Sequence, residues 1–226
     1  MRILVAILLL IISELAMAGP MEEADSAYDK GDFGAARSLY IELANRGERL
    51  AQFKLGVMHE EGKGVAKNSR EALRWYIVSS GQGSPEAAFN LGRLYHDGRG
   101  IPQNYGRARR WYLIATKRGD NKAAVNLGGM DASGEGGPRD YRKAIGWFLF
   151  AAQRGDATAE NNLGTMFLDG IGVPRDLVRS HILYNLAAAH GDSEAVKNRK
   201  LVERLMTSNQ ISRAQQIASE KQMYLP

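Results

Sequence analysis

The sequence predicts an all-α solenoid built from antiparallel helix pairs. The first observation is a Leu-Gly pair that returns at a fixed interval of 36 residues, at Leu55-Gly56, Leu91-Gly92, Leu127-Gly128 and Leu163-Gly164. The second is that a tryptophan, an alanine and several glycines recur in register with that pair. A fixed period of this length indicates a repeat array, in which each unit buries its apolar side against the next.

The first segment, residues 1–18, reads as a secretory signal peptide and not as part of the array. Met1-Arg2 supply positive charge, an apolar run follows, and Ala16-Met17-Ala18 is a small-x-small cleavage pattern. The alternatives are a buried N-terminal helix or an uncleaved anchor. We expect cleavage after Ala18 and a periplasmic or secreted mature chain without a transmembrane span. The sequence contains no cysteine, so this chain can occupy an oxidising compartment without disulfides.

One repeat is expected to contain two helices joined by a glycine turn. In the first helix, Ala88, Leu91 and Leu94 recur at three- and four-residue steps and define one apolar stripe. Gly92 lies on that stripe, which suggests that a neighbouring helix approaches closely there. Gly98 then ends the helix, because glycine adopts the positive φ angles that other residues avoid.

The second helix of the repeat is expected to begin after Asn104 and to end at Gly119. An Asn or Asp side chain at this place accepts hydrogen bonds from the free backbone amides of the helix. Asn68 with Glu71 also fits the reciprocal capping arrangement. The packed face is predicted to carry the aromatic pair, so the tryptophan column is assigned to the core. The equivalent caps are Asn68, Asp140 and Asp176, and the tryptophans are Trp75, Trp111 and Trp147.

This pattern resembles the SEL-one-like repeat, a subclass of the tetratricopeptide superfamily. The resemblance rests on A-F-N-L-G-R-L-Y-H-D-G-R-G-I at Ala88 to Ile101, on A-R-R-W-Y at Ala108 to Tyr112, and on their counterparts 36 residues away. It implies a right-handed superhelical solenoid whose first helices line a concave groove and whose members mostly hold other proteins. Residues 19–50 resemble an ordinary tetratricopeptide repeat, 51–194 hold four repeats of 36 residues, and 195–226 are expected to form C-terminal capping helices.

The third repeat departs from the pattern at Asp131, which stands where Tyr95 and Phe167 stand in its neighbours. An unpaired buried carboxylate is costly. Asp131 is therefore expected to be solvated or to be paired, either with Arg139 or with a Lys or Arg of a neighbouring repeat. A carboxylate that contacts a ligand is the remaining alternative.

The formal charge of +5 comes from Lys and Arg that are dispersed among the helices and mixed with acids. A solvated charged face is one interpretation, and weak attraction to an anionic envelope surface is the other. Nucleic acid is not expected as a partner, because no nucleic-acid-binding motif accompanies the charge. The four histidines lack metal-ligand spacing and no catalytic motif is present, so the sequence predicts no enzyme, metal site or cofactor.

A column of mostly asparagines directly precedes the Leu-Gly pairs and is the best candidate for a binding site. If the first helices line a groove, these amides can donate to and accept from the main chain of an extended peptide. The alternative is that each amide ties its own helix to a neighbouring backbone. Nearby apolar and cationic side chains would tune specificity. The column is Lys54, Asn90, Asn126, Asn162 and Asn198, and the neighbouring residues are Phe53, Phe89 and Arg93.

The predicted function is therefore a secreted or periplasmic scaffold that binds a protein or peptide partner in the concave groove. Two alternatives remain open. One is a cell-wall or β-lactam hydrolase, which depends on family analogy alone and is weakened by the lack of cysteine. The other is an accessory subunit of an envelope machine, for which the basic surface would matter.

Overall fold

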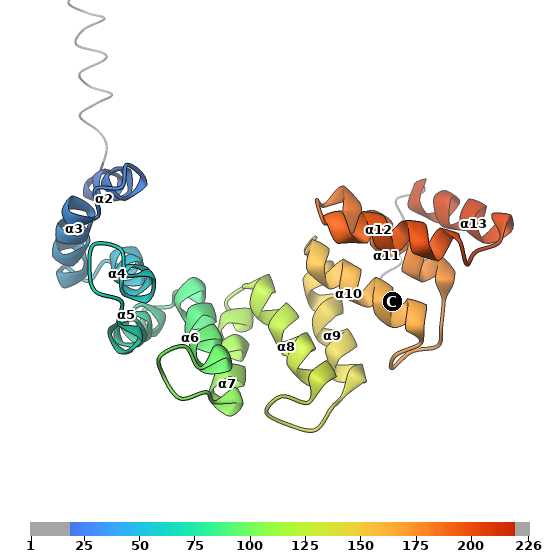
Figure 1. Cartoon of the computed structure of the whole chain (residues 1–226), viewed down its shortest axis with the longest axis horizontal. Helices are drawn as coiled ribbons and strands as arrows, with labels where there is room; N and C mark the ends of the chain where they lie inside the picture. Colours follow the sequence, from blue (N-terminus) through green and yellow to red (C-terminus); the bar gives the residue numbers. More distant parts are fainter. Residues whose placement is uncertain (1–18, 220–226) are drawn as a thin grey trace, which may run out of the picture. The chain divides into compact units, whose positions relative to one another are not determined.

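The computed structural model describes residues 19–219 (Figure 1). The predicted signal peptide and the last part of the predicted cap, residues 220–226, lie outside the described residues. Every regular element within residues 19–219 is an α-helix, so the predicted all-α fold of helix pairs is confirmed. The chain divides into two compact units, Met1–Gln103 and Asn104–Pro226, which are described separately.

Unit 1 contains five of the described helices. Each first helix packs against the second helix of its own pair, α2 with α3 and α4 with α5. The second helices then pack against the first helix that follows, α3 against α4 and α5 against α6. The bounds are α2 (Pro20–Asp29), α3 (Phe33–Asn45), α4 (Arg49–Glu61), α5 (Ser69–Gly81) and α6 (Pro85–Asp97).

Unit 2 repeats this arrangement and continues into two further helices, α12 and α13. Helices α8 and α9 form one pair and α10 and α11 the next, while α12 and α13 both pack against α11. Thr207 and Gln210 form the expected reciprocal cap before the last helix. The bounds are α7 (Tyr105–Lys117), α8 (Asn121–Ser133), α9 (Tyr141–Ala152), α10 (Ala157–Asp169), α11 (Leu177–Ala189), α12 (Ser193–Glu203) and α13 (Ser208–Ser219).

The predicted helix ends are found at the turns. Gly98 has a φ of 68° and closes α6 in the left-handed conformation, which glycine adopts without a Cβ penalty. Asn104 caps α7 by accepting a hydrogen bond from the backbone amide of Arg107. The side chain of Asn68 accepts hydrogen bonds from the backbone amides of Arg70 and Glu71, as predicted for a cap. The reciprocal half of the predicted arrangement is wrong, because the backbone amide of Asn68 donates to the carbonyl of His59. Glu71 forms an ion pair with Arg74 instead.

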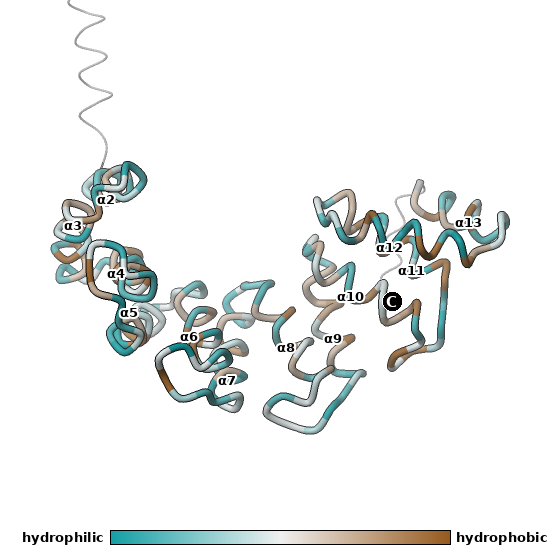
Figure 2. Tube along the Cα trace, viewed as in Figure 1, coloured by the Kyte–Doolittle hydropathy of each residue, from teal (hydrophilic) through white to brown (hydrophobic). Residues whose placement is uncertain are grey.

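Close packing between helices explains the Leu-Gly pair. A Cβ added at Gly164 of α10 would lie 2.7 Å from the ring of Tyr184 on α11. At Gly56 the corresponding distance to the Tyr76 ring is 2.5 Å. The glycines therefore admit an aromatic ring against the backbone of the first helix, as the sequence predicted. Hydrophobic and hydrophilic residues both recur along the helices (Figure 2), as expected when one side of a helix is packed and the other faces solvent.

The assignment of the tryptophan column to the core is confirmed only in part, because Trp75 and Trp147 pack against buried core clusters without being buried themselves. The tryptophans are half-buried, whereas the aromatic residue that directly follows each of them is buried. The residue one step further along the helix faces the glycine, so the ring at that position takes the interior space. The buried rings, at the same interval of 36 residues, are Tyr40, Tyr76, Tyr112, Phe148 and Tyr184.

Within residues 19–219, no helix combines the length and the apolar character that crossing a membrane would require.

Candidate functional site

The predicted binding residues lie on first helices in both units. Phe53 and Lys54 lie on α4, while Phe89, Asn90 and Arg93 lie on α6. Asn126, Asn162 and Asn198 lie on α8, α10 and α12. All eight side chains are half-buried, so each has some contact with solvent. Their hydrogen-bond partners, however, differ between the two units.

In unit 1, a hydrogen-bonded cluster forms around the buried hydroxyl of Tyr76. This hydroxyl donates to Glu60 Oε2 over 2.8 Å, and the Asn90 side chain also hydrogen-bonds to it. The other carboxylate oxygen of Glu60 accepts from Arg93 Nη2 over 2.5 Å. Burial, and then the charge of Glu60, raise the pKa of Tyr76 above its ordinary value. The cluster joins α4, α5 and α6, so Asn90 takes the tying role that the sequence left as an alternative.

The other predicted residues on α4 also contact the interior of unit 1. The ring of Phe53 lies 5.8 Å from the ring of Tyr76. Lys54 pairs with Asp25 of α2 over 2.8 Å, and the same carboxylate accepts from the Tyr40 hydroxyl. Burial alone would raise the pKa of Asp25, but the bonds from Lys54 and Tyr40 outweigh it and hold that pKa below its ordinary value.

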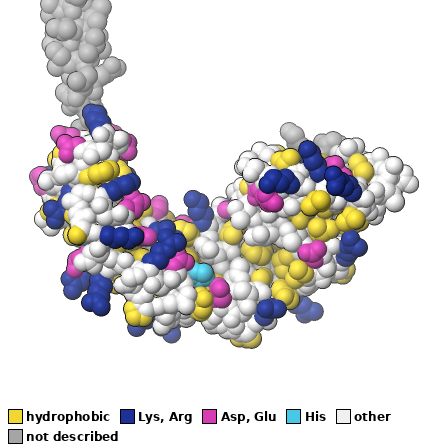
Figure 3. Space-filling view, viewed as in Figure 1, with side chains coloured by type: hydrophobic (Ala, Val, Ile, Leu, Met, Phe, Trp, Pro, Cys, Tyr) yellow, Lys and Arg dark blue, Asp and Glu magenta, His cyan; other side chains and the backbone are white. Residues whose placement is uncertain are grey.

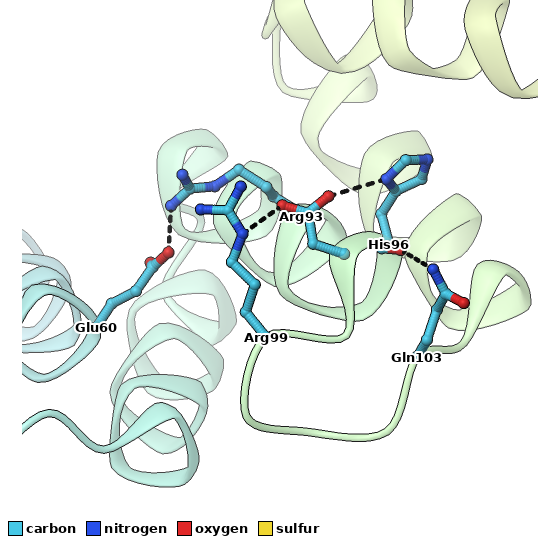
Figure 4. Close-up of polar contacts among 6 residues, drawn as sticks. Glu60, Arg93, His96, Arg99 and Gln103 are labelled. Atoms are coloured by element: carbon cyan, nitrogen blue, oxygen red, sulfur yellow. Dashed lines mark hydrogen bonds and ion pairs between the residues drawn. The ribbon is translucent and has the colours of Figure 1, made fainter.

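A cleft of about 420 Å³ opens beside this cluster. Arg93 approaches it from α6 and Arg99 from the following loop, with both guanidinium groups on the side of Glu60 (Figure 4). Arg99 Nε is held by Asp97 Oδ2 at 2.9 Å, and the other oxygen of Asp97 contacts His96. The lining residues are Glu60, Glu61, Lys63, Lys67, Ser69, Arg93 and Arg99.

The cleft continues into a second depression of about 650 Å³ at the start of α5. The two share Lys67, Ser69 and Arg99, and the second adds Arg70 but no carboxylate. Arg93 was among the predicted binding residues, but this site was not predicted from the sequence. Its signal was present in the clustering of Lys63, Lys67, Arg70 and Arg99 in or beside two consecutive glycine turns, which helix periodicity does not detect.

In unit 2, the asparagines differ in their bonding. Asn198 donates to Asn161 Oδ1 over 3.0 Å and so connects α12 to α10. The side chains of Asn126 and Asn162 make no hydrogen bond to any other residue within 19–219. Both amides can therefore accept or donate a bond to an added ligand.

The surface beside these two amides is partly apolar. Val125 and Ala132 of α8 are half-buried against the core, and Gly129 between them is exposed with no atom within 4 Å of an added Cβ. On the face that Figure 3 draws, hydrophobic side chains gather over the middle of unit 2, and Lys and Arg side chains lie at its margin. This combination suits an extended chain that presents main-chain amides and small apolar groups.

Asp131 is buried and paired with a cation, which is one of the alternatives predicted from the sequence. Its carboxylate accepts from Arg109 Nη2 over 2.5 Å and from the indole Nε1 of Trp147 over 3.0 Å. Arg109 belongs to the preceding repeat. Arg139, the other partner considered, donates instead to the hydroxyl of Tyr141.

Among residues 19–219, no group of three or more His, Asp or Glu side chains is arranged to hold a metal ion. Two of the histidines contact a glutamate of another helix. His181 is buried and contacts Glu203 at 3.0 Å, and His190 contacts the buried Glu160 at 2.9 Å.

Comparison with known proteins identifies the repeat. The Sel1 repeat model matches residues 49–84, 85–120, 121–156 and 157–192. Among solved structures, a Sel1 repeat protein from Oxalobacter formigenes is 28% identical with a TM-score of 0.76, and the match covers 89% of this chain and 84% of that one. The comparison with curated proteins finds no match.

Two further structures are similar over part of their length. A protective antigen of uropathogenic Escherichia coli with an SLR fold is 26% identical, with a TM-score of 0.51 over 89% of this chain and 52% of the antigen, so this chain spans about half of it. An immunity protein from Pseudomonas aeruginosa is 18% identical, with a TM-score of 0.50 over 76% of this chain and 68% of that one, which shows the fold alone.

The matched repeats cover more than half of the chain, and their boundaries agree with the helix pairs that the structure contains. The Sel1 repeat belongs to the tetratricopeptide-like superfamily, as the glycine and aromatic spacing indicated. The chain therefore belongs to the Sel1 repeat family.

Proposed function

We propose that the protein is a periplasmic or secreted scaffold that binds an extended polypeptide segment of a partner along its first helices. Sel1 repeat proteins generally act as protein-interaction scaffolds. The observation that carries the finer proposal is the pair of amides on α8 and α10, Asn126 and Asn162, which no described side chain or backbone group occupies. Amides of this kind bind the main chain of a peptide and tolerate varied sequences.

The test is a comparison of asparagine variants against a peptide selected from a random library on the purified mature chain. Asn126→Ala with Asn162→Ala removes two free amides, each worth about 0.5–1.5 kcal/mol if it contacts the peptide, so affinity should fall roughly 5- to 160-fold. Helical content and melting temperature should stay unchanged.

Asn90→Ala is the matched control from the same column. This change removes a hydrogen bond to the buried Tyr76 hydroxyl, so it should lower the free energy of unfolding by about 0.5–1.5 kcal/mol. Unchanged peptide affinity in the Asn126/Asn162 variant would refute the proposed surface. Unfolding of that variant would show instead that these amides are structural ties.

Sel1 repeat scaffolds are generally non-catalytic, and we propose the same of this protein. The hydrolase alternative makes a distinct prediction. Turnover of a β-lactam or of purified cell-wall peptidoglycan by the mature chain would overturn this part of the proposal.

A second candidate function is weak attraction to an anionic envelope surface through the second helices of unit 2. None of the residues of α7, α9 and α11 is acidic, and several cations lie among half-buried apolar side chains such as Ile114 and Phe150. Cations next to apolar groups favour an anionic lipid surface. The cations are Arg107, Arg110, Lys117, Arg142, Lys143 and Arg179.

Co-sedimentation with vesicles tests this candidate. The chain should bind vesicles that contain phosphatidylglycerol and not vesicles of phosphatidylcholine, and binding should weaken as salt rises. Arg110→Glu with Lys143→Glu should abolish it, since both side chains are exposed. Equal binding to both lipids, or no effect of the double variant, would rule the candidate out.

A further inference from the structure

We infer that the cationic cleft of unit 1 binds an acidic segment of the partner polypeptide, through carboxylates held by Lys67, Arg70 and Arg99. This inference rests on the proposed scaffold function and names the chemistry of one partner segment. The carrying observation is that two adjoining depressions, of about 420 and 650 Å³, collect five cations from two consecutive repeats.

Charge pairing within the cleft leaves positive charge unbalanced. Arg93 pairs with Glu60, Lys63 with Glu61 at 2.8 Å, and Arg99 with Asp97. Lys67 and Arg70 are both exposed, and neither side chain has a partner within residues 19–219. Arg99 is bound to Asp97 through Nε, and its side chain is 62% exposed. The open end of the cleft is therefore cationic, and it carries Lys and Arg hydrogen-bond donors that can bind a ligand.

The repeat fold does not require these cations. One repeat further along, the position of Arg93 is occupied by Gly129 and that of Arg99 by Glu135. The backbone packing of the junction, in contrast, is common to both repeats, because a Cβ added at Gly100 would lie 2.5 Å from Ser69 and one added at the equivalent Gly136 would lie 3.0 Å from Tyr105. The charges are therefore what distinguishes this junction. A specific arrangement at one junction of the array, absent from the next, favours recognition over general solubility.

The shape and charge select a carboxylate-bearing peptide over other anions. At one end, Glu60 and Glu61 already use the charges of Arg93 and Lys63, whereas the second depression contains no carboxylate. The carboxylates of a bound segment are therefore placed at the end that carries Lys67, Arg70 and Arg99. The combined space exceeds what one small anion fills and suits side chains spaced along an extended segment. Arginine and lysine bind such carboxylates through charge-assisted hydrogen bonds.

The experiment measures the affinity of a fluorescein-labelled Gly-Ser peptide with alternate glutamates, using anisotropy at low salt on the mature chain. The same peptide with lysines in place of glutamates is the charge control and should not bind. In Lys67→Ala with Arg99→Ala, the Kd should rise about tenfold or more, the range expected for lost charged hydrogen bonds. Added salt should weaken binding of the parent.

Arg46→Ala with Arg74→Ala is the matched variant. It removes the same net charge from unit 1, and its side chains are 63% and 75% exposed and lie outside the cleft. Its Kd should stay within about twofold of the parent, since exposed pairs contribute little. Absence of binding by the parent, or equal loss in both double variants, would overturn the inference.

The last part of the test is a competition experiment with inorganic phosphate at constant ionic strength. Phosphate should displace the acidic peptide no better than chloride does, and selective displacement would mark a small-anion site and overturn the inference. Failure here is distinguishable from failure of the scaffold proposal, because that proposal is tested with library-selected peptides and variants of α8 and α10.

Discussion

At the scale of single residues, aromatic hydrogen-bond donors and their carboxylate partners connect the helices. Tyr40 with Asp25, Tyr76 with Glu60, and Trp147 with Asp131 each place an aromatic donor against a carboxylate. A cation from an adjacent helix pair then balances each carboxylate. Each cluster therefore connects neighbouring helix pairs, and the pairing matters most at Asp131, because a buried carboxylate is costly unless it is paired and hydrogen-bonded.

Arg109→Ala tests this view of the clusters. The change leaves the carboxylate of Asp131, whose side chain is 4% exposed, without its cation. It should lower the free energy of unfolding by about 3 kcal/mol, measured by urea denaturation. Arg110→Ala is the control, since Arg110 is the adjacent residue and is exposed. Equal stability of the two variants would show that the cluster contributes nothing.

Two glycines of the first helices should respond in opposite directions to alanine. At Gly164 a Cβ would lie 2.7 Å from the Tyr184 ring, so Gly164→Ala should destabilise the protein by about 1–3 kcal/mol. At Gly129 nothing lies within 4 Å, so Gly129→Ala should stabilise it by up to ~1 kcal/mol through helix propensity. Thermal melts of the two variants measure the difference. Shifts of the same sign would contradict the packing described for Tyr184.

At the scale of helices, the same two positions of the repeat form a side-chain hydrogen bond in different repeats, but with different residues. Gln82 donates to the buried Gln52 over 2.9 Å. Three repeats later, 108 residues along the chain, His190 and Glu160 occupy the same two positions. Burial raises the pKa of Glu160 above its ordinary value of 4.5, and the bond to His190 opposes this only in part.

The direction of that shift predicts a dependence of stability on pH. The folded protein holds the Glu160 proton more tightly than the unfolded chain does, so this contribution to stability is lost as pH rises from 4.5 through the raised pKa. Glu160→Gln should flatten the dependence in that window and should fold as well as the parent at pH 8, as the Gln52–Gln82 pair suggests.

Glu194→Gln is the comparison for this experiment, because Glu194 is 60% exposed on α12. Its melting temperature should follow the parent at every pH. If stability depended on pH in Glu160→Gln as it does in the parent, the role assigned to the Glu160–His190 contact would be refuted.

Sequence predicted the helices more completely than their contacts. The glycine period and the Asn and Asp caps located both helices of each repeat, because turn and cap chemistry is local. The fuller burial of Tyr76 than of Trp75, and the different hydrogen bonding of Asn90 and Asn126, depend on which atoms another helix presents. The sequence offered the same two interpretations, peptide binding or a structural tie, for every asparagine of the column, and it could not show that their hydrogen bonding differs. The cationic cleft was missed for the same reason, since its residues come from different turns.

At the scale of the whole molecule, export remains a prediction. The mature protein should begin at Gly19, because Ala16 and Ala18 satisfy the small-residue requirement of signal processing. N-terminal sequencing of protein purified from the periplasm or medium measures this. Recovery of the chain with Met1-Arg2 intact would contradict it.

The central claim is that a partner polypeptide binds along the first helices of the array. Gly129 on α8 and Gly146 on α9 form a matched pair, because both are exposed helical glycines with no atom within 4 Å of an added Cβ. Each can be replaced by p-benzoylphenylalanine, followed by photo-crosslinking in cells. We predict a discrete crosslinked polypeptide from position 129 and none from position 146. Crosslinks from 146 alone, or from neither position, would contradict it.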